Sequence, residues 1–121
     1  MKQLFPNWMS GDGALSMANP KIEPLKKILE RDPHDEVAWF GLGKAYLKDK
    51  SYPEAKKALE QTLQLQPSYS AAYLALAQAL YKSQQIQECR QICLKGIAVS
   101  RNQGDLMVTK QLEHFLRMLP D

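Results

Sequence analysis

The stretch WFGLGKAY, residues 39–46, returns further along the chain in altered form as YLALAQAL, residues 73–80. Each copy begins with a large aromatic residue, followed by a leucine three positions on and a small residue directly after it. This spacing is typical of a helix with one packed face. Internal similarity at a period of about 20–50 residues indicates a repeat protein, in which each unit buries its apolar face by stacking on its neighbours. We therefore expect a stack of helices.

Cap and turn residues divide the repeated region into helix pairs. Asp35 stands directly before the helix that contains residues 39–46 and is a candidate N-cap. Ser51 begins a Ser-Tyr-Pro-Glu sequence that matches a capping box, so a second helix is predicted to follow it. Ser68 or Ser70 is expected to cap the helix of the second copy. The same order of helix, turn and helix then recurs.

Shorter apolar patterns lie on either side of the two pairs. Leu25, Ile28 and Leu29 share one face of a predicted helix, which ends before Pro33 because proline disfavours the α conformation of the preceding residue. A last helix, with a polar outer face that would close the stack against solvent, has its apolar face at Val108, Leu112, Phe115 and Leu119.

Residues 1–20 are predicted to form an irregular tail, because Ser10-Gly11-Asp12-Gly13 and Asn19-Pro20 break helices. The tail nevertheless carries large apolar side chains, which is unusual for a disordered segment; they are Leu4, Phe5, Trp8 and Met9. Two alternatives stay open. These side chains lie against the molecule's own groove or its open first edge, or the segment is a flexible start.

The composition is that of an ordinary globular domain. The chain has 121 residues, 45% hydrophobic and 24% charged, which suffices for one domain with its own core. The net charge is +3, and acidic residues lie between the scattered basic ones. Because a nucleic-acid-binding protein usually concentrates basic residues on one face, we expect no nucleic-acid partner.

Signals for membrane insertion or export are missing from the sequence. No run of 18 apolar residues occurs, and residues 1–10 lack the continuous apolar region of a secretory signal, so we expect no membrane association. Two cysteines do not make a disulfide framework in a chain of this length. These features together predict a reducing, cytoplasmic location.

The sequence also lacks a recognisable reactive site. Cys89 and Cys93 are four positions apart on a predicted helix and are expected to pack as small apolar groups. A structural zinc ion needs four ligands, and both histidines are far away in sequence. No glycine-rich phosphate loop, G-x-S-x-G or H-E-x-x-H sequence is present. We predict no catalytic residue, no metal and no cofactor, and hence a protein that is not an enzyme.

Two segments, residues 36–69 and 70–103, resemble tetratricopeptide repeats. The first matches the family pattern at Trp39, Leu42, Gly43, Tyr46, Ala55 and Pro67, and the second matches it at Tyr73, Leu76, Ala77, Leu80 and Gly96. The chain further resembles small stand-alone bacterial members of the family. The resemblance implies an all-α fold, an α-α superhelix of antiparallel helix pairs.

The implied organisation is an irregular tail at residues 1–20 and a single repeat domain at residues 21–119. The domain would consist of a half unit (21–35), repeat 1 (36–69), repeat 2 (70–103) and a capping helix (104–119). About two full units would thus be preceded by half a unit and closed by one helix.

The resemblance implies a binding surface as well, because the first helix of each unit forms the concave face in this family. Carried onto this sequence, the peptide-binding groove consists of Val37, Phe40, Gly41, Lys44, Leu47, Lys48, Ala71, Leu74, Ala75, Gln78, Tyr81 and Lys82. The lysines would favour an acidic partner. A solvated face with a few isolated apolar residues is the alternative interpretation of these positions.

The expected function is therefore that of a non-catalytic adaptor or scaffold, which holds a short acidic peptide segment of a partner protein in the groove. The alternative is a structural protein that forms a homodimer through its terminal helix or its open first edge.

Overall fold

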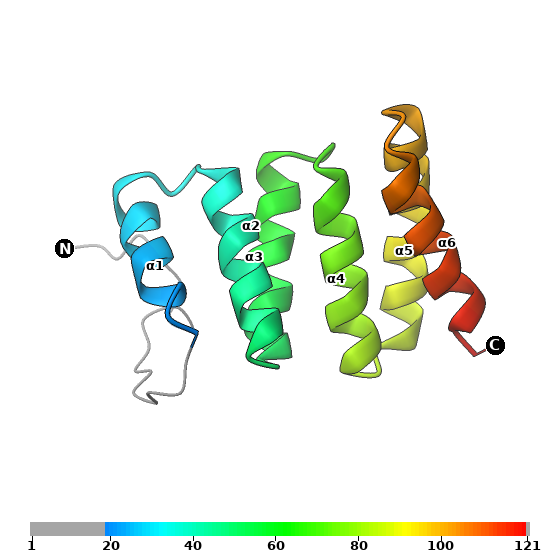
Figure 1. Cartoon of the computed structure of the whole chain (residues 1–121), viewed down its shortest axis with the longest axis horizontal. Coiled ribbons are helices and arrows are strands. Elements are labelled where there is room, and N and C mark those ends of the chain that lie inside the picture. The colour runs from blue at the N-terminus through cyan, green and yellow to red at the C-terminus, as the bar shows by residue number, and fades with distance from the viewer. Residues whose placement is uncertain (1–18, 121) are drawn as a thin grey trace.

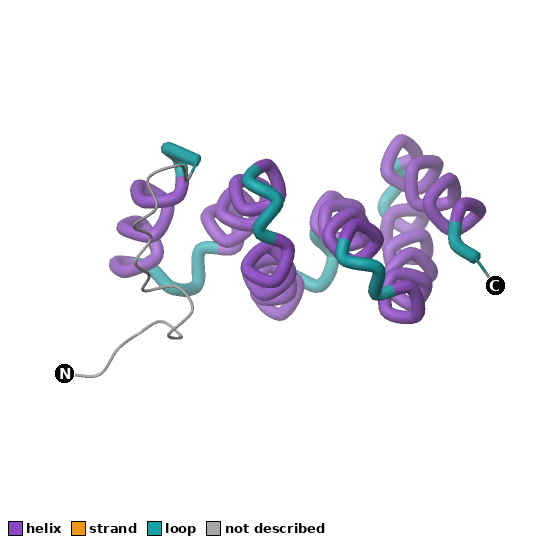
Figure 2. Tube along the Cα trace, turned by 90° about the horizontal axis from the view of Figure 1, so that it is seen from below, coloured by secondary structure: helices purple, strands orange, loops and turns teal. Residues whose placement is uncertain are grey.

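The computed structural model describes residues 19–120, which form six α-helices and no strand (Figure 1). The helices are α1 (Ile22–Arg31), α2 (Glu36–Lys48), α3 (Tyr52–Leu65), α4 (Ser70–Lys82), α5 (Ile86–Asn102) and α6 (Leu106–Met118). Consecutive helices run antiparallel in an elongated row with α1 and α6 at opposite ends, and Figure 2 views this row along the helices. The predicted all-α fold is confirmed. The alternatives for Leu4, Phe5, Trp8 and Met9 concern positions outside the described residues.

The repeat extends to individual hydrogen bonds. The indole N–H of Trp39 donates to the carbonyl oxygen of Pro33 at 2.8 Å, and the hydroxyl of Tyr73 donates to the carbonyl oxygen of Pro67 at the same distance. Each bond ties a buried aromatic side chain near the start of a helix to the loop before it. The first copy of the pattern and the second therefore have the same local structure.

The turns within the two pairs are also equivalent. Lys50 and Gln84 adopt φ angles of 60° and 61°, the left-handed conformation that often ends a helix. In each turn the next N–H donates back to a carbonyl near the end of the helix, from Ser51 to Tyr46 at 2.9 Å and from Gln85 to Leu80 at 2.8 Å. These bonds satisfy carbonyl groups that would otherwise be left without a partner.

Of the predicted helix caps, the one at Asp35 is confirmed, the one at Ser51 has the predicted position without the capping bond, and the one before α4 is wrong. The side chain of Asp35 accepts a hydrogen bond from the N–H of Ala38 at 3.0 Å, as expected. Ser51 precedes α3 but makes no side-chain cap, and Pro53 near the helix start already removes one N–H that needs a partner. Tyr69, not a serine, precedes α4, and the hydroxyl of Ser70 donates instead to Asp105 at 2.7 Å.

Close contact within the first pair depends on Gly43. A Cβ atom at this position would lie 2.6 Å from the side chain of Leu59, which is fully buried on α3. A real side chain therefore requires α2 and α3 to move apart. The absence of a Cβ lets the two helices pack at the density of a protein interior.

The last helix covers the far end of the row. Val108, Leu112 and Leu119 are buried, and a hydrogen bond of 2.7 Å joins the hydroxyls of Ser100 and Thr109 between α5 and α6. The predicted apolar face is thus confirmed at these three positions, and Phe115 is half-buried. The outer surface is more apolar than expected.

Two side chains at the start of α6 make its outer surface more apolar than predicted. Leu106 is 59% exposed and Met107 is 69% exposed, although Lys110 and Arg117 on the same helix are exposed polar residues as predicted. The polar outer face of α6 therefore lies between its apolar first turn and Met118, which is 42% exposed at the end of the helix.

Candidate functional site

A cleft of about 1120 Å³ opens between α1 and α2 and reaches one residue of α4. We refer to it as the α1–α2 cleft. Its described lining consists of Asn19, Pro20, Lys21, Pro24, Leu25, Val37, Gly41, Lys44, Ala45, Leu47, Lys48 and Gln78. Because α2 and α4 are the first helices of their pairs, the cleft includes part of the predicted groove.

Half of the predicted groove residues line this cleft. They are Val37, Gly41, Lys44, Leu47, Lys48 and Gln78. Because Gly41 has no side chain, space is left beside α2. A Cβ atom at this position would meet only Leu25, at 3.4 Å. The backbone of α2 is therefore accessible from the cleft at this point.

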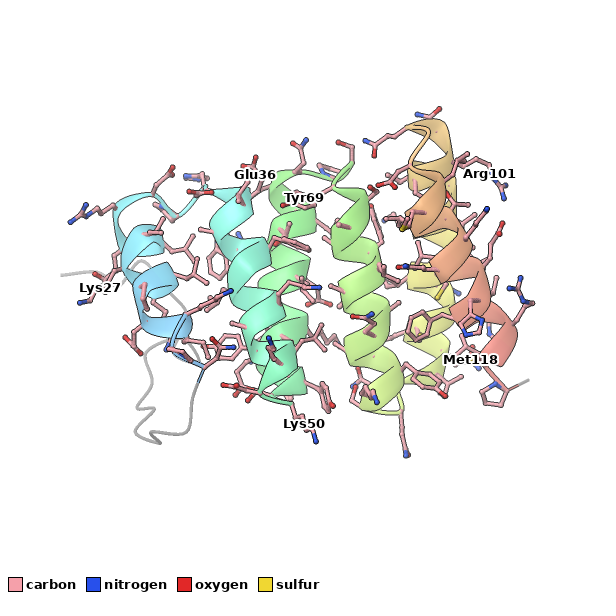
Figure 3. The ribbon with its side chains drawn as sticks, viewed as in Figure 1. Lys27, Glu36, Lys50, Tyr69, Arg101 and Met118 are labelled. Atoms are coloured by element: carbon pink, nitrogen blue, oxygen red, sulfur yellow. The ribbon has the colours of Figure 1, made fainter. Side chains whose placement is uncertain are left out.

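The remaining predicted residues have other surroundings. The ring of Phe40 packs against that of Tyr69, with centroids 4.8 Å apart, and Figure 3 labels Tyr69 beside α2. Ala71 and Leu74 are half-buried, whereas Ala75 is 2% exposed and belongs to the apolar core around α4. Ala75 therefore offers no accessible surface to a ligand.

The C-terminal part of the predicted groove lies at a second, smaller cleft. Tyr81 and Lys82 line it together with Gln84, Ile86, Met118 and Pro120, and its volume is about 480 Å³. The ring of Tyr81 also meets Phe115 edge to face at 5.6 Å. Figure 3 labels Met118 at this end of the molecule. The twelve predicted residues are thus divided between two clefts and the packed surface between them.

Sequence reasoning missed the contribution of α1. Lys21, Pro24 and Leu25 line the α1–α2 cleft, and Asn19, which also lines it, donates its N–H to the carboxylate of Asp49 at 2.6 Å. The sequence contained a signal for this. The pattern before Pro33 corresponds to the second helix of a pair, so one face of α1 is expected to be the one that the first helix of a pair covers.

The cleft is electropositive at its lining. Lys21, Lys44 and Lys48 are exposed there, and no acidic side chain is among the described lining residues. The ammonium group of Lys44 lies 6.0 Å from the centre of the Phe40 ring, at the outer limit of a cation–π contact. Exposed charges of one sign attract a ligand of the opposite sign and hasten its association.

Both cysteines are unsuited to nucleophilic chemistry. They are fully buried on α5, and burial raises the pKa of the Cys93 thiol to about 12 and that of Cys89 above its usual value. Because the thiolate is the nucleophile, thiols with raised pKa values are inert near neutral pH. The sulfur of Cys89 lies 3.4 Å from the carbonyl oxygen of Ala77 and packs between helices, as predicted.

Neither a metal site nor a membrane-spanning helix is found among residues 19–120. Within this range no group of three or more histidine, cysteine, aspartate or glutamate side chains could hold a metal ion. Over the same residues, no helix combines the length and the apolar character that crossing a bilayer requires.

Comparisons with known proteins identify the class. The family model described as tetratricopeptide repeat matches residues 22–62 and 46–106. The TPR repeat-containing protein PA0015 of Pseudomonas aeruginosa is 32% identical over 98 residues, which cover 81% of this chain and 93% of the relative. The solution structure of protein BPP2914 from Bordetella parapertussis has a TM-score of 0.70 and 30% identity, covering 78% of this chain and 83% of that one.

The chain therefore belongs to the tetratricopeptide repeat family, as the resemblance predicted. Repeats of this family generally mediate protein–protein interactions and are generally not catalytic. Both relatives are bacterial proteins.

Proposed function

We propose that the protein is a non-catalytic adaptor that holds a short acidic segment of a partner protein in the α1–α2 cleft. The observation that carries the proposal is the lining, in which three lysines and no described acidic residue accompany the apolar side chains of Leu25 and Val37. A segment with a carboxylate beside an apolar side chain is complementary to this surface.

The rest of the predicted groove extends this proposed binding surface. Phe40, Ala71, Leu74 and Tyr81 are half-buried and therefore offer part of their apolar area to a ligand, and Lys82 is exposed. Ala75 takes no part because it is buried. A segment that continues beyond the α1–α2 cleft would pass over these side chains.

The proposal is tested by selecting short peptides from a random display library against the full chain. We expect the selected peptides to be rich in aspartate and glutamate. The double substitution Lys44→Glu with Lys48→Glu should then weaken binding by roughly tenfold or more, because two attractive charges become repulsive. Binding is measured by calorimetry at low and at physiological salt, and higher salt should weaken it.

The matched control is Lys95→Glu with Lys110→Glu, which makes the same change in net charge at exposed lysines on α5 and α6. This control should bind the selected peptides nearly as well as the unmodified chain. Equal loss in both double variants, or loss in neither, would contradict a specific site in the cleft.

Self-association is the second candidate function, and the exposed side chains of Leu106 and Met107 favour it. Two large apolar residues exposed side by side at the end of a helical row can pair with the same residues of a second copy. Sedimentation velocity over a dilution series tests this candidate. A dimer that Met107→Lys dissociates would support it, and a monomer at every concentration would rule it out.

A further inference from the structure

One face of α1 is largely exposed among residues 19–120, although the same face of α3 is fully buried. One repeat period carries position 39 onto position 73. By the same shift, Lys21 directly before α1 and Pro24, Leu25 and Ile28 within it correspond to Ala55, Ala58, Leu59 and Thr62 of α3. All four α3 residues are buried at 0% exposure, whereas Ile28 is 44% exposed, Lys21 and Pro24 are exposed and Leu25 is half-buried. In the α2–α3 pair, the covering element is the first helix of the pair.

The exposed face of α1 forms one wall of the α1–α2 cleft. Lys21, Pro24 and Leu25 line the cleft, and the opposite wall is α2. The cleft therefore lies where the first helix of a complete unit would lie relative to α1. An element placed there would contact α1 as α2 contacts α3.

The chain itself supplies a segment at this place. Residues 1–18 precede Asn19, which lines the cleft and is held there by the hydrogen bond from its N–H to Asp49. The cleft runs along α2 from Lys48 to Val37, a helix length of roughly 17 Å. Ten residues of extended chain reach at most about 33–36 Å, so the segment is long enough to run the length of the cleft.

The apolar residues of the segment occur in the matching register. Phe5 and Trp8 stand one repeat period before Trp39 and Leu42, which are both buried on α2. By the same shift Met9 corresponds to Gly43, the residue whose missing Cβ allows α2 to approach α3. A methionine side chain at this position would keep a docked segment further from α1 than α2 lies from α3. The segment would therefore be held less firmly against α1 than α2 is held against α3.

We propose that residues 1–18 of this chain dock in the α1–α2 cleft, with Phe5 and Trp8 against α1, and compete there with the acidic partner segment. The competition rests on the proposed function, whereas the docking does not. A tethered segment competes at a high effective concentration even when its contacts are weak. The partner would therefore have to displace it.

Tryptophan fluorescence tests the docking in the full chain without any peptide. The chain has two tryptophans, and Trp39 is 4% exposed, so the difference between the unmodified chain and Trp8→Phe isolates the emission of Trp8. We expect Trp8 to emit at short wavelength and to be quenched weakly by acrylamide. Gly41→Gln places a polar side chain in the cleft and should raise the quenching of Trp8 several-fold.

Two controls accompany this measurement. Gly41→Ala adds only a methyl group, which would meet Leu25 at an ordinary 3.4 Å, and should leave Trp8 protected. Phe5→Ser should expose Trp8, whereas Leu15→Ser, a similar change at a tail position outside the matching register, should not. The proposal is overturned if Trp8 is as accessible as free tryptophan in the unmodified chain. It is also overturned if the protection grows with protein concentration, because a second copy then supplies the segment.

The selected acidic peptides test the competition separately. Phe5→Ser with Trp8→Ser should raise their affinity several-fold over the unmodified chain, and unchanged affinity would overturn the competition. If no peptide binds either chain, the proposed function fails, and the fluorescence of Trp8 still decides whether the segment docks.

Discussion

Single residues decide how closely the helices of this protein approach one another. Gly41 and Gly43 lie two positions apart on α2 but face different surroundings. A Cβ at Gly43 would lie 2.6 Å from Leu59, whereas a Cβ at Gly41 would meet Leu25 of the cleft at 3.4 Å. One glycine is therefore required by packing, and the other leaves room at the proposed binding surface.

Substitution of these two glycines by alanine should have opposite effects on the free energy of unfolding. We expect Gly43→Ala to lower the free energy of unfolding by about 1–3 kcal/mol, because the extra methyl group overpacks the interface with α3. Gly41→Ala should raise it by up to about 1 kcal/mol, because alanine favours the helix more than glycine does. Urea unfolding of both variants measures the difference. Equal destabilisation by the two changes would mean that the packing at Gly43 is looser than its geometry implies.

Because of Tyr46, the free energy of unfolding should depend on pH in the alkaline range. Burial raises its pKa from 10.0 to about 12, with further contributions from Glu54, Glu23 and Asp49. Below pH 10 the phenol is protonated in both states, so it adds no pH dependence. From pH 10 to pH 12 the unfolded chain releases this proton and the folded chain keeps it, so the free energy of unfolding falls as pH rises.

Tyr46→Phe should therefore lose less stability than the unmodified chain over the same pH range. Denaturant unfolding at several alkaline pH values measures this difference. The raised pKa values of Cys93, Tyr69 and Tyr73 act in the same direction and are common to both chains. Parallel curves for the two chains would show that Tyr46 titrates normally.

At the scale of the helix, the sequence patterns predicted where helices lie better than how they begin. Asp35 caps α2 as expected, because its short carboxylate reaches the N–H of Ala38 at 3.0 Å. Ser51 carries the sequence of a capping box and makes no such bond. Asp105 caps α6 through the N–H of Val108 although its φ and ψ angles (−86°, 76°) nearly equal those of Ser51 (−92°, 74°), so the backbone angles at the N-cap do not decide by themselves whether a candidate cap is used.

Alanine substitution should lower the stability by different amounts at the two candidate caps. Asp35→Ala should cost about 1 kcal/mol of stability, since an N–H group at the start of α2 loses its partner. Ser51→Ala should change stability by less than about 0.5 kcal/mol, because no side-chain cap is lost. Thermal unfolding of both variants gives the comparison. A larger loss from Ser51→Ala than from Asp35→Ala would refute this account of the two helix starts.

At the scale of the whole molecule, the row of helices has two unlike ends. At the C-terminal end, α6 packs on α5, with a buried hydrogen bond between them. At the other end, α1 packs on α2, and no second helix among residues 19–120 covers the other face of α1. In a stack whose units are stabilised mainly by their neighbours, the helix with fewest buried contacts is the first to open.

Amide hydrogen exchange should follow this order. We expect the amides of α1 to exchange at least about tenfold faster than those of α3 and α4, which corresponds to a local stability lower by roughly 1.4 kcal/mol. Exchange in α6 should be slower than in α1, because residues from α5 cover it. Uniform exchange across all six helices would indicate that the row opens only as one cooperative unit.

The residue pattern was enough to predict the all-α fold and the pairing of the helices, because a period of large and small residues in this range indicates stacked units and is local to each unit. The family followed from the resemblance of particular residues to its repeat pattern. Which positions of the predicted groove are accessible could be seen only from the packing of the helices. Ala75 is buried, Tyr81 packs on Phe115, and α1 supplies a wall of the cleft, because these outcomes depend on which neighbours each helix has at the two ends of the row.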